Sequence, residues 1–538
     1  MKSPSTKLRA LGERYIERTC SDFPQWGSAL GFSKYEPLLG GSDAKTRADR
    51  NLFLEELRAE AESLPAAALT GDDWLDRRCF LSLLRTELLN GRDLERWRRN
   101  PQECCDGAVG AVFELVIRHA EDLRKARPAI ESRLAAIPRF LKEGASAISS
   151  PVPLWTRLAV QSCKGAREFV ETIGETLAAL SSDPARTRKL ARAAGKAFDL
   201  YASTVAKKKQ GKPGDFAIGS ERFELLVRER TGLDWSLPEI EAEGHRLIAE
   251  LSSELAKEAR RHGRGSVSQI LARARDSWTP EAPLLDLYTR SSDRWRKRVV
   301  KSGLYPIPPG ETLKVTPVPD FMRDHFPTAA YSSPGPFEKR QRGIFWVNDL
   351  GATKKDPEEA LREARQHFGL ELTSAHEGYP GHHLQFAIQN RHPSHIRRLC
   401  SHAIFYEGWT MWCEKLAVEK GWVRGPHARL QQLHDALWRA YRIVIDCGLH
   451  SGKLTHEAAA QVLVKGVGFT PDRARADVNW YTAAPTVPMS YLLGRLELER
   501  VKSRFIDAEA WSLRKFHDWA LSHGAVPWTW IEQSSRRG

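Results

Sequence analysis

Apolar residues recur at intervals of three and four positions over most of this chain, and this spacing limits what the chain can fold into. Residues at that spacing line one face of an α-helix, so each segment that shows it predicts an amphipathic helix. The segments are 51–63, 74–90, 110–124, 154–182, 188–205, 221–231, 238–260, 357–379, 398–420, 428–450, 455–466 and 489–521. The sequence therefore predicts a mainly α-helical fold.

Two short segments interrupt this pattern and predict strands. Leu313–Thr316 and Ile344–Asn348 are rich in β-branched and aromatic residues, and we expect them to form a small sheet. The second segment precedes the histidine-containing helix, where an extended chain can pair with the backbone of a bound peptide. We expect a helical N-terminal lobe of residues 1–300 that caps a deep channel, and a catalytic lobe of residues 301–538 that contains the sheet.

Three histidines and one glutamate occur within the stretch His376–His383. A second acidic position, Glu407, lies in an aromatic and apolar segment, where a carboxylate is costly to bury unless it is paired or binds a cation. A catalytic zinc site requires three protein ligands and a general base. Here two imidazoles and the distant carboxylate could be the ligands, and the carboxylate adjacent to the first histidine could be the base. The alternative is a purely structural role for these histidines.

The histidines do not have the usual spacing of a helical zinc motif. In HExxH the two histidines lie four residues apart on one helix face, but here Pro380 occupies the second position. The next histidine, His382, follows His376 after six residues, which on a straight helix rotates it by about 240°. Proline cannot donate a helical hydrogen bond, and Gly381 adopts backbone angles that other residues avoid. We therefore expect a two-residue bulge, which restores the four-residue relation and favours His382 over His383 as the second ligand.

The bacterial family known as domain of unknown function 885 has a signature that this chain resembles in the string His376-Glu377-x-x-Pro380-Gly381-His382-His383-x-Gln385. Members of that family are similar, more remotely, to carboxypeptidase Taq, thimet oligopeptidase and angiotensin-converting enzyme. Further blocks match the family in the same order: Ser332–Gly335 with Ile344–Asn348, Phe405–Trp409, Asp446–His450 and Pro485–Gly494. The resemblance covers most of the chain after about residue 200.

The resemblance implies a zinc site with three protein ligands. These ligands would be His376, His382 and Glu407, and Zn²⁺ would be the cofactor. Glu377 would act as the general base that takes a proton from the attacking water and later passes it to the leaving amine.

The resemblance also implies two residues that act on the substrate. Tyr491 would donate a hydrogen bond to the tetrahedral oxyanion, and His450 would contact the substrate or the oxyanion. A packing role is the alternative for Tyr491. Glu414, seven residues after Glu407 on the same helix face, is either a partner of the metal site or an ordinary exposed acid.

Two departures from the family pattern bear on specificity. Trp480 stands where the family has an arginine, and Thr486-Val487 stand where it has Gly-Gln. Arginine is the side chain best suited to hold a carboxylate, so its loss matters if the family uses it for a peptide C-terminus. The nearby arginines that offer a replacement are Arg473, Arg475 and Arg495. We expect altered specificity rather than lost chemistry.

These features together predict a zinc-dependent hydrolase of a peptide or peptide-like amide, of exopeptidase or carboxypeptidase type, that acts on small substrates. One alternative is a specialised hydrolase of a non-protein amide, which Trp480 and Val487 keep open. Another is a non-catalytic helical binding protein, although neither Glu377 nor a metal ligand is missing. The substrate, the cleaved bond and the oligomeric state do not follow from the sequence.

Composition bears on partners and location. The 538 residues carry a net charge of +14, but the basic clusters are short and mixed with acids, so we predict no nucleic-acid partner. No stretch is long and apolar enough for a membrane span, and the first ten residues lack the apolar run of a secretory signal. The eight cysteines are scattered without a CxxC pair, which favours a reducing compartment. We therefore predict a cytoplasmic protein.

Overall fold

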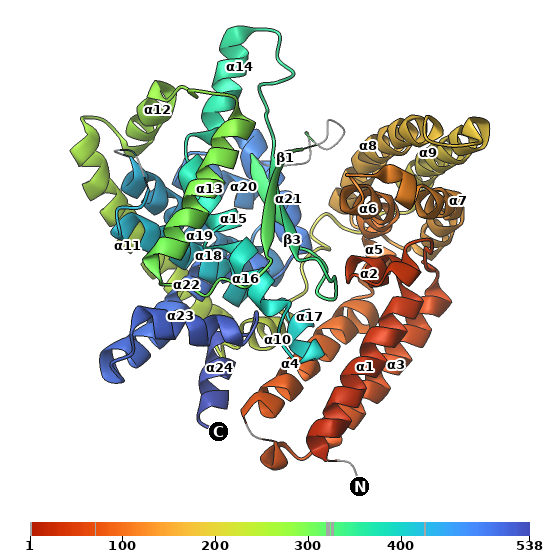
Figure 1. Ribbon diagram of the computed structural model, residues 1–538, viewed down its shortest axis with the longest axis horizontal. Coiled ribbons are helices and arrows are strands. Elements are labelled where there is room, and N and C mark those ends of the chain that lie inside the picture. Colours follow the sequence, from red (N-terminus) through yellow and green to blue (C-terminus); the bar gives the residue numbers. More distant parts are fainter. Residues whose placement is uncertain are drawn as a thin grey trace. The chain divides into compact units, whose positions relative to one another are not determined.

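The computed structural model describes residues 3–69, 71–318, 323, 328–423, 425 and 427–537. The protein is mainly α-helical with one small sheet, as the sequence predicts (Figure 1). It separates into two compact units. The first comprises Met1–Leu69, Phe80–Phe216 and Phe337–Lys339, and the second comprises Thr70–Cys79, Ala217–Pro336 and Arg340–Gly538. The division at residue 300 and the capping role of the N-terminal lobe stay predictions.

The first unit consists of helices packed on one another. Several begin at a polar residue whose side chain accepts a hydrogen bond from the first turn, as at Asp43, Asn100 and Asp183. Its helices are α1 (Pro4–Asp22), α2 (Pro24–Ala29), α3 (Ala44–Ser63), the later part of α4 (Gly71–Leu88), α5 (Arg96–Arg99), α6 (Pro101–Arg118), α7 (Leu123–Ala147), α8 (Pro153–Ala178) and α9 (Pro184–Ala206). Helix α9 packs against both α8 and α7.

The second unit contains the sheet and the remaining helices. These helices are α10 (Ser220–Thr231), α11 (Leu237–Ala259), α12 (Val267–Ser277), α13 (Leu284–Ser302), α14 (Pro357–Ala364), α15 (Leu370–Glu377), α16 (His382–Gln389), α17 (His395–Leu399), α18 (Ala403–Glu419), α19 (Ala428–Ser451), α20 (His456–Val467), α21 (Pro471–Ala483), α22 (Val487–Ser503), α23 (Leu513–Ser522) and α24 (Trp528–Ser535). Helix α18 packs along α22, α11 along α19, and α15 against both α13 and α18. All residues predicted for the metal site therefore lie in this unit.

Two glycines let α18 and α22 approach closely. A Cβ atom on Gly408 would lie 2.4 Å from the carbonyl carbon of Gly494, and one on Gly494 would lie 2.1 Å from the carbonyl oxygen of Ile404. Both distances are far inside van der Waals contact, so larger residues require the helices to move apart. The contact places Glu407, the neighbour of Gly408, opposite the turn of α22 that carries Tyr491.

The sheet has three strands in the order β1-β3-β2. Strand β1 (Thr312–Pro317) runs parallel to β3 (Arg342–Val347), and β2 (Ala329–Ser332) runs antiparallel to β3. Both predicted strands are present, whereas β2 was not predicted. Because β3 is the middle strand and pairs on both sides, the extended segment expected to bind a substrate backbone has its hydrogen-bonding groups engaged by β1 and β2.

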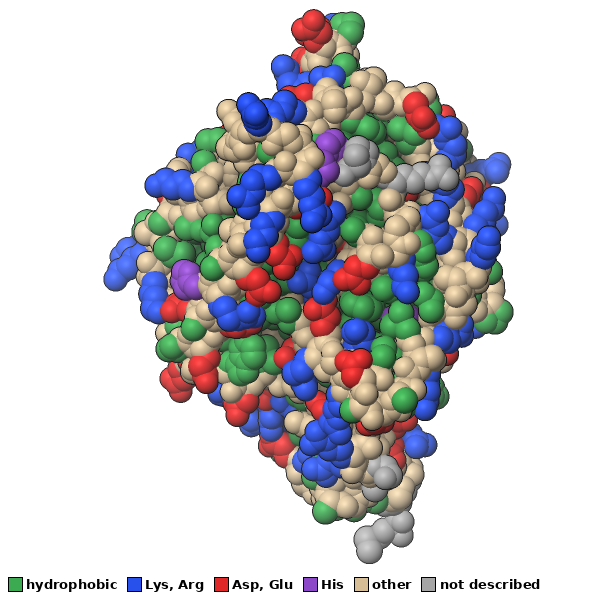
Figure 2. Space-filling view, turned by 90° about the vertical axis from the view of Figure 1, so that its left-hand side faces the viewer, with side chains coloured by type: hydrophobic (Ala, Val, Ile, Leu, Met, Phe, Trp, Pro, Cys, Tyr) green, Lys and Arg blue, Asp and Glu red, His purple; other side chains and the backbone are tan. Residues whose placement is uncertain are grey.

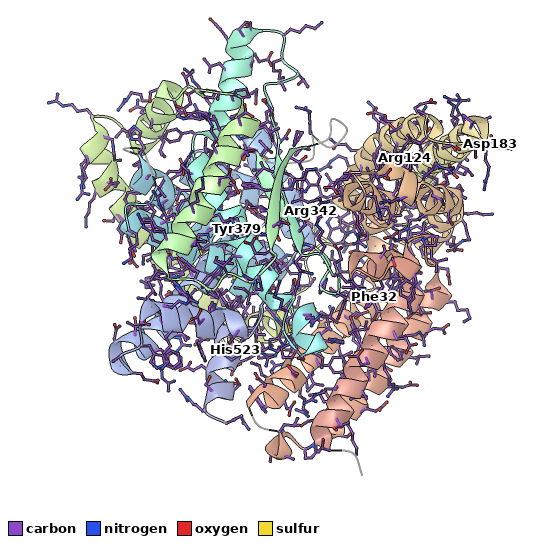
Figure 3. The ribbon with its side chains drawn as sticks, in the orientation of Figure 1. Phe32, Arg124, Asp183, Arg342, Tyr379 and His523 are labelled. Atoms are coloured by element: carbon purple, nitrogen blue, oxygen red, sulfur yellow. The ribbon has the colours of Figure 1, made fainter. Side chains whose placement is uncertain are left out.

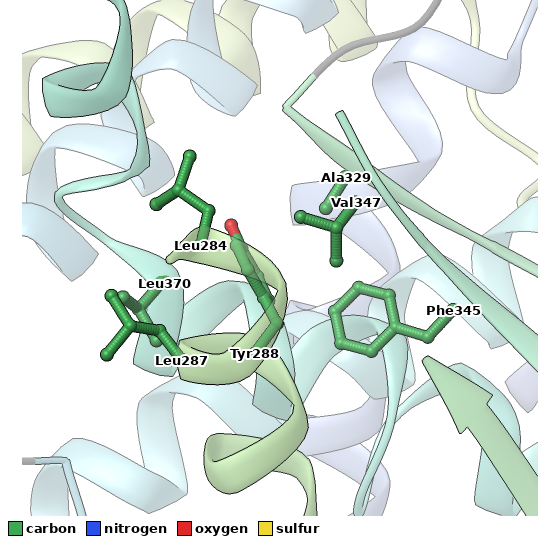
Figure 4. Packing of buried hydrophobic residues seen from close by; sticks show 7 residues of the cluster. All are labelled: Leu284, Leu287, Tyr288, Ala329, Phe345, Val347 and Leu370. Atoms are coloured by element: carbon green, nitrogen blue, oxygen red, sulfur yellow. The ribbon is translucent and has the colours of Figure 1, made fainter. Parts of the chain in front are cut away.

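A cluster of buried side chains attaches the sheet to the helices beside it. The ring of Tyr288 on α13 meets that of Phe345 on β3 edge to face, with centroids 5.5 Å apart (Figure 4). The other members are Leu284 and Leu287 from α13, Ala329 from β2, Val347 from β3 and Leu370 from the start of α15. Burial of these apolar groups fixes the sheet next to α15, the helix that ends in His376 and Glu377.

The surface of the protein carries mixed charges. On the face in Figure 2, Lys and Arg side chains are spread over the surface with Asp and Glu among them. Among the described residues, no helix has the length and apolar character needed to cross a membrane. All eight cysteines are free thiols, and Cys104 alone among them is more than slightly exposed.

Candidate metal centre

The histidine motif lies at the junction of two short helices rather than on one bulged helix. Helix α15 ends at Glu377, and α16 begins at His382. Between them, the N–H of Gly381 donates to the carbonyl oxygen of Ala375 at 3.0 Å. A Cβ on Gly381 would lie 1.8 Å from the carbonyl oxygen of His376, so the tight junction needs glycine. The single helix predicted over 357–379 is wrong, because α14 ends at Ala364 and α15 begins only at Leu370.

This junction brings three predicted ligands together. The Nε2 atoms of His376 and His382 each lie 3.5 Å from Oε2 of Glu407, and the three ligand atoms lie within 4.8 Å of one another. These distances exceed an ordinary hydrogen bond of about 2.9 Å. Two tetrahedral zinc ligands with bonds of about 2.1 Å are roughly 3.4 Å apart. Glu407 Oε2 is buried without a hydrogen-bond partner, so the geometry and the donor set fit a zinc ion.

Glu414 orients one of the two imidazoles. It is buried, and its Oε1 lies 2.6 Å from Nδ1 of His376. Burial lowers the pKa of His376, but Glu407 and Glu414 outweigh it and raise the pKa to about 10. A carboxylate on the far nitrogen fixes the ring so that Nε2 faces the centre, as in metal sites generally. Of the two roles considered for Glu414, the structure supports the partner of the site and excludes the exposed acid.

Charge around Glu407 favours its ionised form. Burial alone would raise the pKa of Glu407, but the nearby His382 and His376 hold it well below its usual range. A buried, ionised carboxylate that faces two imidazoles is a strong oxygen ligand for a divalent cation.

His383 belongs to a different network. Its Nε2 lies 2.8 Å from Glu311, and Tyr379, labelled in Figure 3, also donates to that carboxylate. On the other side of the ring, Nδ1 lies 3.2 Å from the hydroxyl of Tyr331. His383 is thus engaged on both nitrogens, whereas His382 presents Nε2 to Glu407. This arrangement favours His382 as the second ligand.

Glu377 is the carboxylate next to this group. Burial raises the pKa of Glu377, and the charges of His376 and His382 oppose the shift only in part. A raised pKa moves a carboxylate towards the range in which it both accepts and returns a proton. Tyr288 and Tyr331 lie near enough for the charge of Glu377 to contribute to the raised pKa of each hydroxyl.

The two predicted substrate contacts differ in position. Burial and the charge of Glu407 raise the pKa of Tyr491 well above its ordinary value, so its hydroxyl stays protonated beside the centre. His450 stands elsewhere: its Nε2 lies 3.1 Å from the carbonyl oxygen of Tyr481, and its ring stacks on Phe223. The predicted roles of Tyr491 and His450 both stay predictions.

The family departures have a structural setting. Thr486 has a φ of +69°, which explains why glycine is usual at this position. Its N–H and that of Met489 donate to the buried carboxylate of Asp446 at 3.3 Å, which holds the start of α22. Trp480 lies beside a guanidinium that sequence reasoning missed, with its ring centroid 5.3 Å from the central carbon of Arg442.

The arginines expected to replace the missing one are engaged elsewhere. Arg475 pairs with Glu457 at 3.0 Å and Arg495 with Glu499 at 3.5 Å, while Arg473 stacks on Phe469 at 3.8 Å. Arg442 could have been recognised from the sequence. It lies four residues before Asp446 and therefore on the same helix face as the Asp446–His450 block. Glu311 and Tyr331 had no such signal, since only tertiary folding brings them to the motif.

Comparison with known proteins places the chain in a family. The model of the family described as "Bacterial protein of unknown function (DUF885)" matches residues 24–534. The chain belongs to the DUF885 family. No curated protein matches this DUF885 member.

Two solved structures share the fold of this DUF885 protein. One is described as "a putative lipoprotein of unknown function from Shewanella oneidensis", with a TM-score of 0.78 and 19% identity over 98% of this chain and 99% of that chain. The other is "the putative lipoprotein from Colwellia psychrerythraea", with a TM-score of 0.78 and 17% identity over 100% of this chain and 99% of that one. Similarity at this level of identity establishes the fold alone.

These relatives contradict the predicted cytoplasmic location. Both are described as a "putative lipoprotein", and lipoproteins are held at a membrane by an attached lipid. The prediction rested on free cysteines and on the absence of an apolar segment. Buried thiols are free in many compartments, because burial alone keeps them unreactive, so neither property determines where this DUF885 protein resides.

Proposed function

We propose that this protein is a zinc-dependent hydrolase that cleaves a peptide or peptide-like amide. The observation that carries the proposal is the spacing of three buried ligand atoms: two imidazole nitrogens, each 3.5 Å from one carboxylate oxygen that has no hydrogen-bond partner. At 3.5 Å these contacts are longer than hydrogen bonds, and a cation between the three atoms would give the buried oxygen the partner that it lacks. Zinc, when bound, supplies a Lewis acid that polarises the amide carbonyl and acidifies water.

The residues around the centre have the properties that amide hydrolysis needs. Glu377, with its raised pKa, accepts a proton from the attacking water and returns it to the departing amine. Tyr491 keeps its proton and donates a hydrogen bond to the oxygen that becomes negative. Glu414 holds His376 in one orientation, which preserves the ligand geometry while charge moves.

The burial of the centre supports a small substrate. The side chains of His376, His382 and Glu407 are 9–10% exposed, so a folded protein chain cannot reach them. This enclosure, together with the remote resemblance to carboxypeptidase Taq and its relatives, supports an exopeptidase within a peptidase-like fold with a channel. A specialised hydrolase of a non-protein amide is the second candidate, because Trp480 lies where the family has an arginine.

Metal analysis and paired variants test the proposal. The purified protein is expected to contain one zinc per chain and to digest a peptide library, with activity lost to a chelator. Glu377→Gln is expected to keep zinc and lower turnover by about 10²–10⁴-fold, whereas Glu358→Gln, an exposed acid on α14, leaves it unchanged. Zinc that does not bind, or turnover that survives Glu377→Gln, would overturn the mechanism.

A second pair of variants tests the choice of ligand. His382→Gln removes an imidazole that faces Glu407, and zinc content is expected to fall. His383→Gln removes the neighbouring imidazole, which contacts Glu311 and Tyr331, and zinc content is expected to persist. The reverse result would assign the second ligand to His383.

A further inference from the structure

Arg442 on α19 is a buried guanidinium inside an aromatic cage. The side chain is 4% exposed. Its central carbon lies 4.0 Å from the ring centroid of Trp438, 4.7 Å from that of Tyr491, and 5.3 Å from those of Trp480 and Tyr481. Cation–π attraction from these rings offsets part of the cost of burying the charge.

The guanidinium lacks a carboxylate partner. Its Nε donates to the hydroxyl of Tyr481 at 2.8 Å, and Tyr481 in turn donates to Asp477 at 3.1 Å. Nη1 is buried without a hydrogen-bond partner, and within the described part of the chain no acid forms an ion pair with Arg442. The neighbouring Arg439, by contrast, lies 3.7 Å from Asp435. A buried guanidinium without an acidic partner costs free energy, and a negatively charged ligand would offset that cost.

The cage adjoins the metal centre through one side chain. Arg442 lies over the ring of Tyr491 on α22, and one turn after that tyrosine the backbone of Gly494 packs against Gly408, the residue next to Glu407. The unpaired guanidinium therefore contacts the helix that packs beside a candidate zinc ligand. A substrate group bound to Arg442 would therefore lie near an amide bond that is bound at the candidate metal centre.

We propose that Arg442 binds a free carboxylate of the substrate. This inference rests on the proposed hydrolase function and narrows its substrates to peptides or N-acyl amino acids with a carboxylate near the scissile amide. A guanidinium in a dry, aromatic setting holds a carboxylate with strong, directional hydrogen bonds. The guanidinium that this chain lacks at position 480 is thus supplied from α19, with the ring of Trp480 as part of its cage.

A binding measurement tests the carboxylate site without turnover. Zinc-loaded protein is titrated calorimetrically with N-acetyl-phenylalanine and with its C-terminal amide. The acid is expected to bind the natural sequence at least about 10-fold more tightly than the amide, and Arg442→Met is expected to remove that preference. Arg475→Met, which removes an exposed arginine that pairs with Glu457 at 3.0 Å, is the matched control and is expected to keep it.

The remaining variants and outcomes separate the alternatives. Arg442→Lys keeps the charge and the aliphatic stem but not the forked donors, and it is expected to retain only part of the preference for the acid over the amide. This variant gives a second test in case Arg442→Met does not fold. A carboxylate that binds the metal alone would keep its preference in both Arg442 variants, which would overturn the proposal. Equal binding of acid and amide by the natural sequence, or binding of neither, would also overturn it.

Turnover distinguishes this inference from the proposed function. Peptides with a free C-terminus are expected to be cleaved in preference to their amidated counterparts, and Arg442→Met is expected to raise KM for the free acids with zinc content unchanged. If no peptide is cleaved but the acid still binds through Arg442, the hydrolase proposal fails and the carboxylate site stands.

Discussion

Replacement of Gly408 by alanine tests whether the close contact between α18 and α22 builds the metal centre. The added Cβ would lie 2.4 Å from the carbonyl carbon of Gly494, while ordinary contact begins at 3.4 Å, so the helices must separate by about 1 Å (3.4 − 2.4). The obstructing atoms are backbone, which cannot rotate away. We therefore take the upper end of the cost of overpacking, about 3 kcal/mol.

Alanine also stabilises a helix relative to glycine, by about 1 kcal/mol. The expected net loss is therefore about 2 kcal/mol, or a fall of several °C in the midpoint of thermal unfolding. Glu407 is the adjacent residue, so its carboxylate withdraws from the two imidazoles. Metal sites tolerate displacements of about 0.2 Å, and we expect zinc affinity to fall at least about 10-fold.

Thermal unfolding and competition with a chromophoric zinc chelator measure the two effects. The matched control is Gly110→Ala in the interior of α6, where no atom lies within 4 Å of the added Cβ; this variant is expected to gain up to about 1 kcal/mol. Should Gly408→Ala keep its unfolding temperature and its zinc affinity, the contact does not position Glu407 as argued.

Three further predictions concern residues around the centre. Glu414→Gln removes the charge behind His376 and is expected to lower zinc affinity about 10–100-fold in a chelator competition, whereas Glu419→Gln on the same helix is expected to leave it unchanged. Thr486→Gly is expected to stabilise the protein by about 1 kcal/mol in urea unfolding. Glycine removes the strain of a left-handed backbone, about 1–2 kcal/mol, and the cost of a buried hydroxyl without a hydrogen-bond partner, about 1 kcal/mol. The loss of the buried methyl group costs roughly 1 kcal/mol, which is less than the sum of these two gains. A destabilised variant would contradict this. Burial raises the pKa of Asp446 to about 8. Between pH 4 and 8 the folded state therefore keeps a proton that the unfolded state loses. The free energy of unfolding falls over this range by up to about 1.4 kcal/mol for each unit that the pH rises. Asp446→Asn is expected to remove that slope, and a stability difference between the two proteins that is equal at pH 5 and pH 7 would refute the assignment.

The parts of the fold that follow local rules could be predicted from the sequence. Most of the periodic segments became single helices, although 357–379 did not, and both β-branched segments became strands. Helix α7 was missed because Pro128 and Pro138 lie inside it and interrupt the pattern that predicts a helix. The segment 489–521 was predicted as one helix, but α22 ends at Ser503 and α23 begins only at Leu513, since periodicity alone does not reveal where a chain turns.

The candidate site was predictable where chemistry acts over short sequence distances. The Pro-Gly pair predicted a bulge that brings His382 to His376; the two side chains do meet, although the structure has a junction between two helices in place of the bulge. The apolar surroundings of Glu407 indicated a buried, paired carboxylate. The side chains that complete the surroundings, Glu311 and Arg442, were not predictable, because they reach the motif only through the packing of distant helices and strands. A pattern of residue types does not specify those contacts.

The confinement of all three ligand atoms to the second unit has a consequence for how the chain melts. An ion that binds only the folded form adds stability in proportion to the logarithm of its concentration, about 4 kcal/mol at a thousandfold excess over its dissociation constant. That gain would go to the unit that holds His376, His382 and Glu407, since a bound metal would hold the end of α15 and the start of α16 to α18. Calorimetry with and without a chelator should therefore displace one component of the heat-capacity curve and leave the component from the all-helical first unit in place.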